Sequence, residues 1–240
     1  GVFEDKATKN LFACEHVVNN MRGVKTVGVI EDDPITGLTK IAEPVGVICG
    51  VTPTTNPTST AIFKALISLK TRNPIVFGFH PSAQESSAHA AKIVYDAAVK
   101  AGAPENCIQW ITQPSIAATN ALMNHDGIST ILATGGNAMV RAAYSCGKPA
   151  LGVGAGNVPA YIEKSADIRQ AAHDIVMSKS FDNGMVCASE QAVIIDKEIY
   201  KEFVEEFKSY KTYFVNKKEK ALLEEYCFGV KANSKDCAGA

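Results

Sequence analysis

The chain has 240 residues, which is enough for one large domain or two smaller ones with a sizeable core. Hydrophobic residues make up 46% of it and charged residues 20%, and a net charge of −1 argues against nucleic acid or an anionic membrane as a partner. No apolar run approaches the ~18 residues that a membrane-spanning helix needs, and the first residues do not resemble a signal peptide. We therefore expect a cytoplasmic protein.

The cysteines and histidines do not predict a metal site or a disulfide framework. The seven cysteines are an odd number without a CxxC pair, and the histidines lack metal-ligand spacing. A free cysteine is most often a small buried hydrophobe, so a chemical role has to be argued for each one separately. They are Cys14, Cys49, Cys107, Cys146, Cys187, Cys227 and Cys237.

The elements are predicted from the periodicity of apolar residues. The N-terminal part is expected to form a helix over 5–20 and extended segments over 27–31 and 39–42. Strands and helices then alternate. The strands are predicted at 45–51, 74–79, 107–111 and 129–133, and the helices at 60–69, 84–101, 115–123 and from 137 to about 146.

This alternation predicts a parallel, doubly wound α/β sheet with right-handed crossovers. In such sheets ligands bind beyond the carboxyl ends of the strands. The candidate site is therefore expected at the turns 52–57, 80–82 and 134–137.

The regular alternation of predicted strands and helices ends after residue 148. Residues 151–157 form a glycine-rich connection, which is followed by strand, helix, loop, strand and two helices. We expect a domain boundary near residue 149, giving one domain over 1–149 and another over 150–240. Both look incomplete, because the first begins within an element and the second has too few strands for a sheet of its own.

Cys187 follows an Asp-Asn-Gly turn and precedes a predicted strand, where a side chain can face a cleft. A thiolate there could attack a carbonyl carbon. Asn56 lies in a proline-flanked turn at the end of a predicted strand, where its amide could donate to an oxyanion. A buried spacer cysteine and an ordinary turn asparagine fit the same positions, so the residues alone leave both interpretations open.

Two further turns could bind a nucleotide. Gly135 and Gly136 open a predicted helix after a strand, so that their amides could face a phosphate, although the pair is not a full GxGxxG motif. Gly154 belongs to the glycine-rich segment, which could approach a ligand or serve as a flexible joint. His80 follows a strand and could bond a ribose hydroxyl or be a plain turn histidine.

Together these segments resemble one family. Residues 43–47 (EPVGV) and 54–58 (TTNPT) resemble the start of the NAD-binding fold of aldehyde dehydrogenases, 133–136 (ATGG) their phosphate-side turn, and 181–191 (FDNGMVCASEQ) their nucleophile loop. The match runs in order over nearly the whole chain. It is nearest to the CoA-acylating members, first the aldehyde dehydrogenase half of bifunctional aldehyde–alcohol dehydrogenases, then single-domain enzymes.

The resemblance implies an aldehyde dehydrogenase-like fold, with an NAD-binding domain and part of an α/β catalytic domain. It implies that Cys187 is the nucleophile and that Asn56 holds the oxyanion. An aldehyde, CoA and NAD would become acyl-CoA and NADH, with acetaldehyde and acetyl-CoA as the expected pair. The cofactor-binding residues that it implies are Thr52, Pro53, Thr54, His80, Pro81, Gly135, Gly136, Asn137 and Gly154.

Two departures from the hydrolytic members are informative. Those members carry a water-activating glutamate in the segment that matches 151–159, where this chain has no carboxylate. Water is a poor nucleophile without a base, whereas CoA is already partly thiolate, so thiolysis is favoured over hydrolysis. His80 stands where those members usually have a lysine that binds the adenosine ribose, which leaves the choice between NAD and NADP open.

Two alternatives remain. One is a hydrolytic aldehyde dehydrogenase that uses Asp182 or Glu190 as its base, and the other is a non-catalytic fragment of the same fold. The family's full domain is longer than this chain, so we expect a fragment. For its full-length parent the resemblance implies a homo-oligomer, with a filament as one form.

Overall fold

The computed structural model describes residues 2–229, and Cys237 lies outside them. The chain forms two compact units, of which the N-terminal unit takes residues up to 158 together with 180–189 and the C-terminal unit takes the remainder. We expected a boundary near residue 149. The N-terminal unit extends further because the next segment joins its sheet, and it includes the loop of Cys187.

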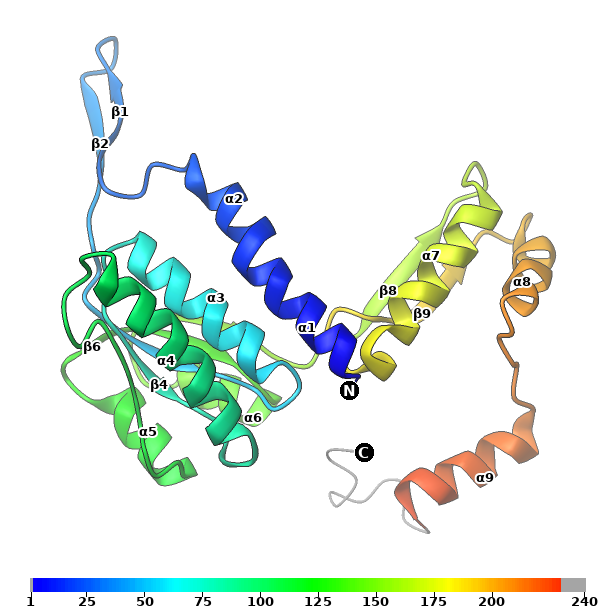
Figure 1. The fold of residues 1–240 in the computed structure, drawn as a ribbon. Helices are drawn as coiled ribbons and strands as arrows, with labels where there is room; N and C mark the ends of the chain where they lie inside the picture. Colours follow the sequence, from blue (N-terminus) through cyan, green and yellow to red (C-terminus); the bar gives the residue numbers. More distant parts are fainter. Residues whose placement is uncertain (1, 230–240) are drawn as a thin grey trace. The chain divides into compact units, whose positions relative to one another are not determined.

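The N-terminal unit opens with the predicted long helix, and the two predicted extended segments pair as a hairpin (Figure 1). The helix consists of α1 (Phe3–Phe12), a π-helical turn (Ala13–Val17) and α2 (Val18–Arg22). The hairpin pairs β1 (Gly28–Asp33) with β2 (Leu38–Ala42) in antiparallel fashion.

A parallel five-stranded sheet forms the centre of this unit, with the strand order β5-β4-β3-β6-β7. The order reverses between β3 and β6, which confirms the predicted doubly wound topology. Its strands are β3 (Val47–Val51), β4 (Ile75–Gly78), β5 (Ile108–Trp110), β6 (Ile128–Thr134) and β7 (Ala150–Val153).

The prediction of a plain glycine-rich connection over 151–157 was wrong for its first residues. Leu151, Gly152 and Val153 belong to β7, which pairs with β6. Gly152 interrupts the apolar run by which a strand is recognised in the sequence. The strand nevertheless requires a glycine at this position, because a larger side chain would collide with its neighbours. A Cβ at Gly152 would lie 2.6 Å from Val140 and 2.7 Å from Tyr144.

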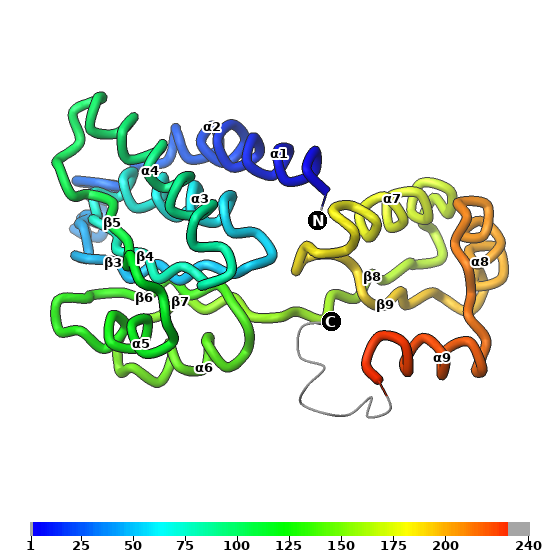
Figure 2. Tube along the Cα trace, turned by 60° about the horizontal axis from the view of Figure 1, so that its bottom comes forward, coloured from blue at the N-terminus to red at the C-terminus, as the bar shows by residue number. Residues whose placement is uncertain are grey.

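Helices cover both faces of the sheet, as Figure 2 shows. Helices α3 (Pro57–Lys70) and α4 (Gln84–Lys100) pack over one face around Ile75 and Phe77. On the other face, α5 (Ile116–Asn124) and α6 (Asn137–Tyr144) enclose a second core that includes Cys49, Met123 and Ile131. Successive residues of β3 face opposite cores, as expected for a sheet that is buried on both sides.

The C-terminal unit is smaller. Its strands β8 (Val158–Ile162) and β9 (Glu190–Ile195) pair with each other, and α7 (Ile168–Ser180) and α8 (Tyr200–Ser209) enclose a core around Phe203. Helix α9 (Lys217–Phe228) follows, and a capping box of Asn216 and Glu219 fixes its start. The assignment of the two units as an NAD-binding domain and part of a catalytic domain stays a prediction.

A buried lysine joins the two central strands. Lys64 of α3 is only 4% exposed, and its ammonium donates to the carbonyls of Val51 in β3 and Leu132 in β6, at 2.6 Å each. Burial lowers the pKa of Lys64 to about 7, and the nearby Cys49 opposes this shift. One side chain thus bridges the point at which the strand order reverses.

We expect Lys64 to make stability depend on pH. Between about pH 7 and ~10.4, the ordinary pKa of lysine, the unfolded chain binds a proton that the folded chain lacks. Stability should therefore rise with pH in this window, by at most ~1.4 kcal/mol per pH unit, and this gain should be lost progressively as the pH falls from ~10.4 to about 7, below which no further change is expected from Lys64. Lys64→Met should flatten the rise in melting temperature.

Lys70→Met is the matched control for this measurement, because Lys70 lies on the same helix but is partly exposed. The control should keep the slope of the wild-type protein. A Lys64→Met protein whose melting temperature follows pH as steeply as the wild type would contradict the expectation.

Candidate functional site

The site is built at the carboxyl ends of β3 and β6. These strands are parallel neighbours, and Val51 pairs with Ala133 near their ends. The turn 52–56 leads from β3 into α3, and Gly135-Gly136 lead from β6 into α6. Both turns therefore leave the sheet at the same edge, as the strand order predicted.

The β6 turn suits an anionic group. Gly136 precedes α6 without a side-chain cap, and an added Cβ there would meet no atom within 4 Å. Gly135 donates its N–H to Val153 at 3.0 Å, and a Cβ at Gly154 would lie 2.9 Å from Asn137 Oδ1. The three predicted glycines and Asn137 thus lie together, and the open first turn of α6 could accept a nucleotide phosphate.

The predicted residues of the β3 turn differ in how accessible they are to a ligand. Thr52 is 2% exposed, and its hydroxyl has no hydrogen-bond partner among the described residues. A ligand could reach this hydroxyl only if the turn moved. Pro53 is half-buried and Thr54 is exposed, so both can contact a ligand directly.

The third predicted turn follows β4, which lies next to β3 in the sheet. His80 is exposed, and its Nδ1 accepts a hydrogen bond from the Ser82 N–H at 3.2 Å. That bond leaves Nε2 as the nitrogen that can bind a ribose hydroxyl. Pro81 is exposed as well and begins a 3-10 turn, Pro81–Ala83, ahead of α4.

Asn56 does not cap the helix that it precedes. Its side chain makes no capping bond to α3, and Oδ1 instead accepts a hydrogen bond from the ammonium of Lys9 in α1. An ammonium has only donors, so its partner must be the carbonyl end of the amide. The NH₂ end of Asn56 therefore remains available for an acceptor such as a developing oxyanion.

The same lysine binds the loop that precedes Cys187. Asp182 has no exposed side-chain surface, and its carboxylate pairs with Lys9 and, at 2.7 Å, with Lys6. The Val2 N–H donates to Asp182 at 2.8 Å, and the Asp182 N–H donates to Asp5 at 2.7 Å. We call Lys6, Lys9 and Asp182 the Asp182 cluster.

Burial and charge oppose each other in this cluster. Desolvation raises the pKa of Asp182, but hydrogen bonds from Lys6, Lys9 and the Val2 N–H outweigh it and hold the pKa below its usual range. Desolvation lowers the pKa of Lys9, and Lys6 lowers it further against the opposing effect of Asp182. Asp182 is therefore an ionised carboxylate whose oxygens already accept hydrogen bonds from Lys6, Lys9 and the Val2 N–H.

This result removes one of the two bases named in the predicted hydrolytic alternative. Asp182 cannot act as the base of a hydrolytic enzyme, because it is buried, fully ion-paired and weakly basic. Glu190 belongs to the C-terminal unit, where its Oε1 accepts a hydrogen bond from Ser178 at 3.1 Å.

Cys187 lies in a loop of unusual backbone shape. Asp182, Asn183 and Gly184 have φ angles of 52°, 55° and 70°, in the left-handed region that non-glycine residues avoid. Cys187 is exposed, and a Cβ at Gly156 would lie 3.5 Å from its carbonyl oxygen. The loop therefore presents the thiol to solvent beside the glycine-rich segment.

Exposure alone does not single out this cysteine. Cys14 and Cys227 are exposed too, Cys146 is half-buried, and Cys49 and Cys107 are buried. Burial raises the pKa of Cys49 to about 12, so that this thiol is inert at neutral pH. What distinguishes Cys187 is a loop that is linked to the Asn56 turn through Lys6 and Lys9 of α1.

Lys6 and Lys9 were missed in the sequence. They were included only in a predicted helix over 5–20, and two lysines on an N-terminal helix ordinarily face solvent. The available signal was their spacing of three residues, which places both on one helix face. Nothing in the sequence identified Asp182 as their partner.

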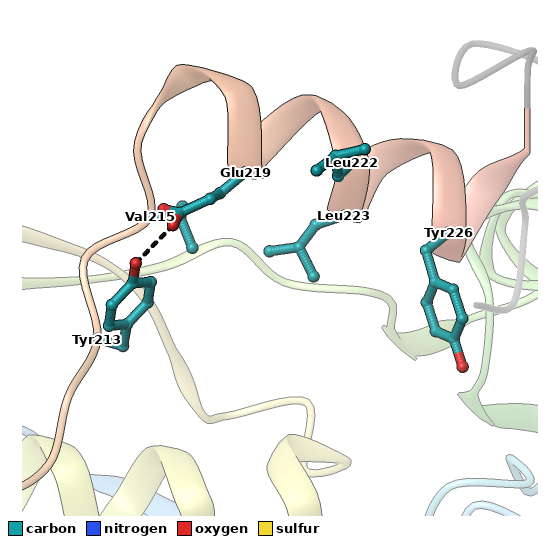
Figure 3. Close-up of a pocket in the computed structure, with 6 residues that line it drawn as sticks. All are labelled: Tyr213, Val215, Glu219, Leu222, Leu223 and Tyr226. Carbon is teal, nitrogen blue, oxygen red and sulfur yellow. Dashed lines mark hydrogen bonds between the residues drawn. The ribbon is translucent and has the colours of Figure 1, made fainter.

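Other features of residues 2–229 carry no assigned chemistry. Within that range, no group of histidine, cysteine and acidic residues could hold a metal ion, and no helix is long and apolar enough to cross a membrane. The C-terminal unit has an open apolar groove of about 600 Å³, in which the Tyr213 hydroxyl donates to Glu219 at 2.6 Å (Figure 3). Its remaining lining residues are Val215, Leu222, Leu223 and Tyr226.

Comparisons with known proteins agree with this geometry. A model of the aldehyde dehydrogenase family matches residues 7–222. An aldehyde-alcohol dehydrogenase from Streptococcus pneumoniae is 88% identical over all 240 residues, which make up 27% of that protein. An acetylating aldehyde dehydrogenase from Geobacillus thermoglucosidasius is 54% identical with a TM-score of 0.87, over 92% of this chain and 49% of that one.

A propionaldehyde dehydrogenase from Rhodopseudomonas palustris, solved with bound propionyl-CoA, is 32% identical with a TM-score of 0.76, over 95% of this chain and 53% of that one. The chain thus spans only part of the length of the relatives that it matches. The resemblance to the CoA-acylating members is confirmed by these relatives. The chain belongs to the aldehyde dehydrogenase family.

Proposed function

We propose that the protein interconverts an aldehyde and CoA with an acyl-CoA, using a nicotinamide cofactor and a thioester on Cys187. The observation that carries this proposal is that one lysine joins the Asn56 turn to the Cys187 loop. Lys9 binds both Asn56, the predicted oxyanion donor, and Asp182 in the loop that presents the exposed Cys187.

The first half of the reaction forms the thioester. The Cys187 thiolate attacks the aldehyde carbon, and the oxygen that becomes negative accepts hydrogen bonds from the Asn56 NH₂ and the Cys187 N–H. A nicotinamide, when bound, would supply the acceptor for the hydride that leaves this carbon. Cys187 thus keeps the substrate carbon covalently bound, and the two donors stabilise the negative charge that develops on its oxygen.

The second half releases the acyl group. The CoA thiolate attacks the thioester carbon, the same two donors hold the oxyanion, and the bond to Cys187 breaks to return a thiolate. Acetaldehyde and acetyl-CoA are the proposed pair, and the support for this choice is the likeness to a solved acetylating aldehyde dehydrogenase.

The cofactor in this proposal is NAD. The first turn of α6, which Gly136 precedes, would take its phosphates, and His80 would take a ribose hydroxyl. Gly135 would shape this turn without donating to the phosphate, because its N–H is bonded to the Val153 carbonyl. The structural support is the open helix start and the free Nε2 of His80. Assembly into a homo-oligomer or a filament and a cytoplasmic location also belong to the proposal.

The absence of a water-activating base supports transfer to CoA. The segment 151–159 carries no carboxylate, and at Gly152 a larger side chain would meet Val140 and Tyr144. Asp182 is committed to its lysines. A positioned base contributes typically ~10²–10⁴-fold, so without one the thioester should react far better with a thiolate than with water.

We expect sustained turnover only with CoA. In the full-length protein, reduction of NAD by acetaldehyde should stop after one turnover when CoA is omitted, with the acyl group left on Cys187. Absorbance of the reduced cofactor and mass spectrometry of the intact protein measure both quantities. Steady turnover without CoA, at a rate close to that with CoA, would contradict the proposal.

The two proposed catalytic residues should behave differently from other exposed positions. Cys187→Ser should abolish aldehyde oxidation, and Asn56→Ala should lower kcat by about 10²–10³-fold, the usual effect of losing one oxyanion donor. Cys14→Ser removes an exposed thiol in the π-helical turn between α1 and α2 and should leave kcat unchanged. Retained activity in Cys187→Ser would disprove the thioester.

A further inference from the structure

Lys9 occupies a position with two different partners. Its ammonium binds Asn56 Oδ1 at the start of α3 and Asp182 Oδ2 in the Cys187 loop, and its side chain is only 15% exposed. These partners are far apart in the sequence and belong to separate parts of the proposed site. Lys9 itself lies on α1, outside every segment that resembled the family's site motifs.

The chemistry of the ammonium decides which way the Asn56 amide faces. The two ends of a carboxamide have nearly the same shape, so packing alone does not distinguish them. Lysine has donors and no acceptor, and it therefore holds the carbonyl end and turns the NH₂ end away. In the flipped amide, two donors would face each other and no donor would face the oxyanion.

Lys6 provides a natural comparison. It binds the same carboxylate oxygen of Asp182, at 2.7 Å, but its other partner is the backbone carbonyl of Thr55 and not the Asn56 side chain. Both lysines therefore share the task of neutralising Asp182. Lys9 alone of the two contacts the amide whose orientation matters.

We propose that Lys9 is a positioning residue, which acts through Asn56 by holding its amide with the NH₂ group toward the reacting carbonyl oxygen. The inference rests on the proposed function, in which Asn56 is the oxyanion donor. Lys9 makes no contact with substrate in this role. Asp182 supports it indirectly, by holding the ammonium and by tying the Cys187 loop to α1.

Two reactions of the same thiol separate this role from support of the fold. Acetyl transfer from acetyl-CoA to Cys187 forms a thioester and releases the CoA thiolate through a tetrahedral oxyanion. Alkylation of Cys187 by iodoacetamide displaces iodide and forms no oxyanion. The ratio of the two rates therefore reports on oxyanion stabilisation and cancels changes in the exposure or thiolate fraction of Cys187.

We expect Lys9→Met in the full-length protein to lower the acetylation rate by about 10²-fold, as loss of an oxyanion donor does, and to leave the alkylation rate unchanged. Lys6→Met is the matched control and should change the rate ratio little. Added to Asn56→Ala, Lys9→Met should slow acetylation no further, since residues that act through one another are not additive. Mass spectrometry of the Cys187 peptide measures both products.

Each other outcome identifies what failed. If acetylation and alkylation fall equally in Lys9→Met, or if Lys6→Met lowers the ratio as much, Lys9 only supports the loop and the inference is overturned. If Asn56→Ala itself leaves acetylation unchanged, the proposed oxyanion role fails first. A loss in Asn56→Ala without a loss in Lys9→Met overturns the positioning role alone.

Circular dichroism and the melting temperature check the fold of each variant. If Lys9→Met does not fold, Lys9→Gln replaces it, because its polar amide can remain in the site. A glutamine offers both a donor and an acceptor, so it does not select one end of Asn56, and the rate ratio should again fall. An unchanged ratio in Lys9→Gln would overturn the inference.

Discussion

The buried carboxylate of Asp182 is the interaction on which the N-terminal unit's site depends. It has no exposed surface, so it requires the two lysines of α1 as counter-charges, and it draws the backbone of the Cys187 loop to the start of that helix. The loop adopts left-handed angles that would be unfavourable without these contacts. A charged cluster and not a hydrophobic core therefore holds the loop that precedes Cys187.

Much of this architecture could be predicted from the sequence. The apolar runs of β3, β4 and β6 and the periodic helices between them predict a parallel doubly wound sheet, and the sheet places the β3 and β6 turns at one edge. Strand β7 escaped prediction because Gly152 interrupts its apolar pattern. The local pattern of apolar residues therefore predicts a strand or helix reliably only where that element is long or strongly apolar.

The site was predictable only in part, for a physical reason. Cys187 and Asn56 lie in turns whose residue types suggest a role, whereas the proposed role of Lys9 depends on contacts with residues far along the chain. Solvent-facing lysines and ion-paired lysines have the same local sequence. Asp182 shows the opposite error, in which the sequence suggests a role that the structure does not support. A carboxylate near a predicted nucleophile suggests a base, but the burial and ion pairs of Asp182 exclude that role.

The bridge of Lys64 between β3 and β6 has a consequence for the gap between the two turns. The two carbonyls that it binds need two N–H donors, and a lysine side chain has three when protonated and two when neutral. Loss of the proton near neutral pH therefore leaves both bonds intact. We therefore expect the contact of Lys64 with both strands to persist on either side of its pKa, although its charge changes there.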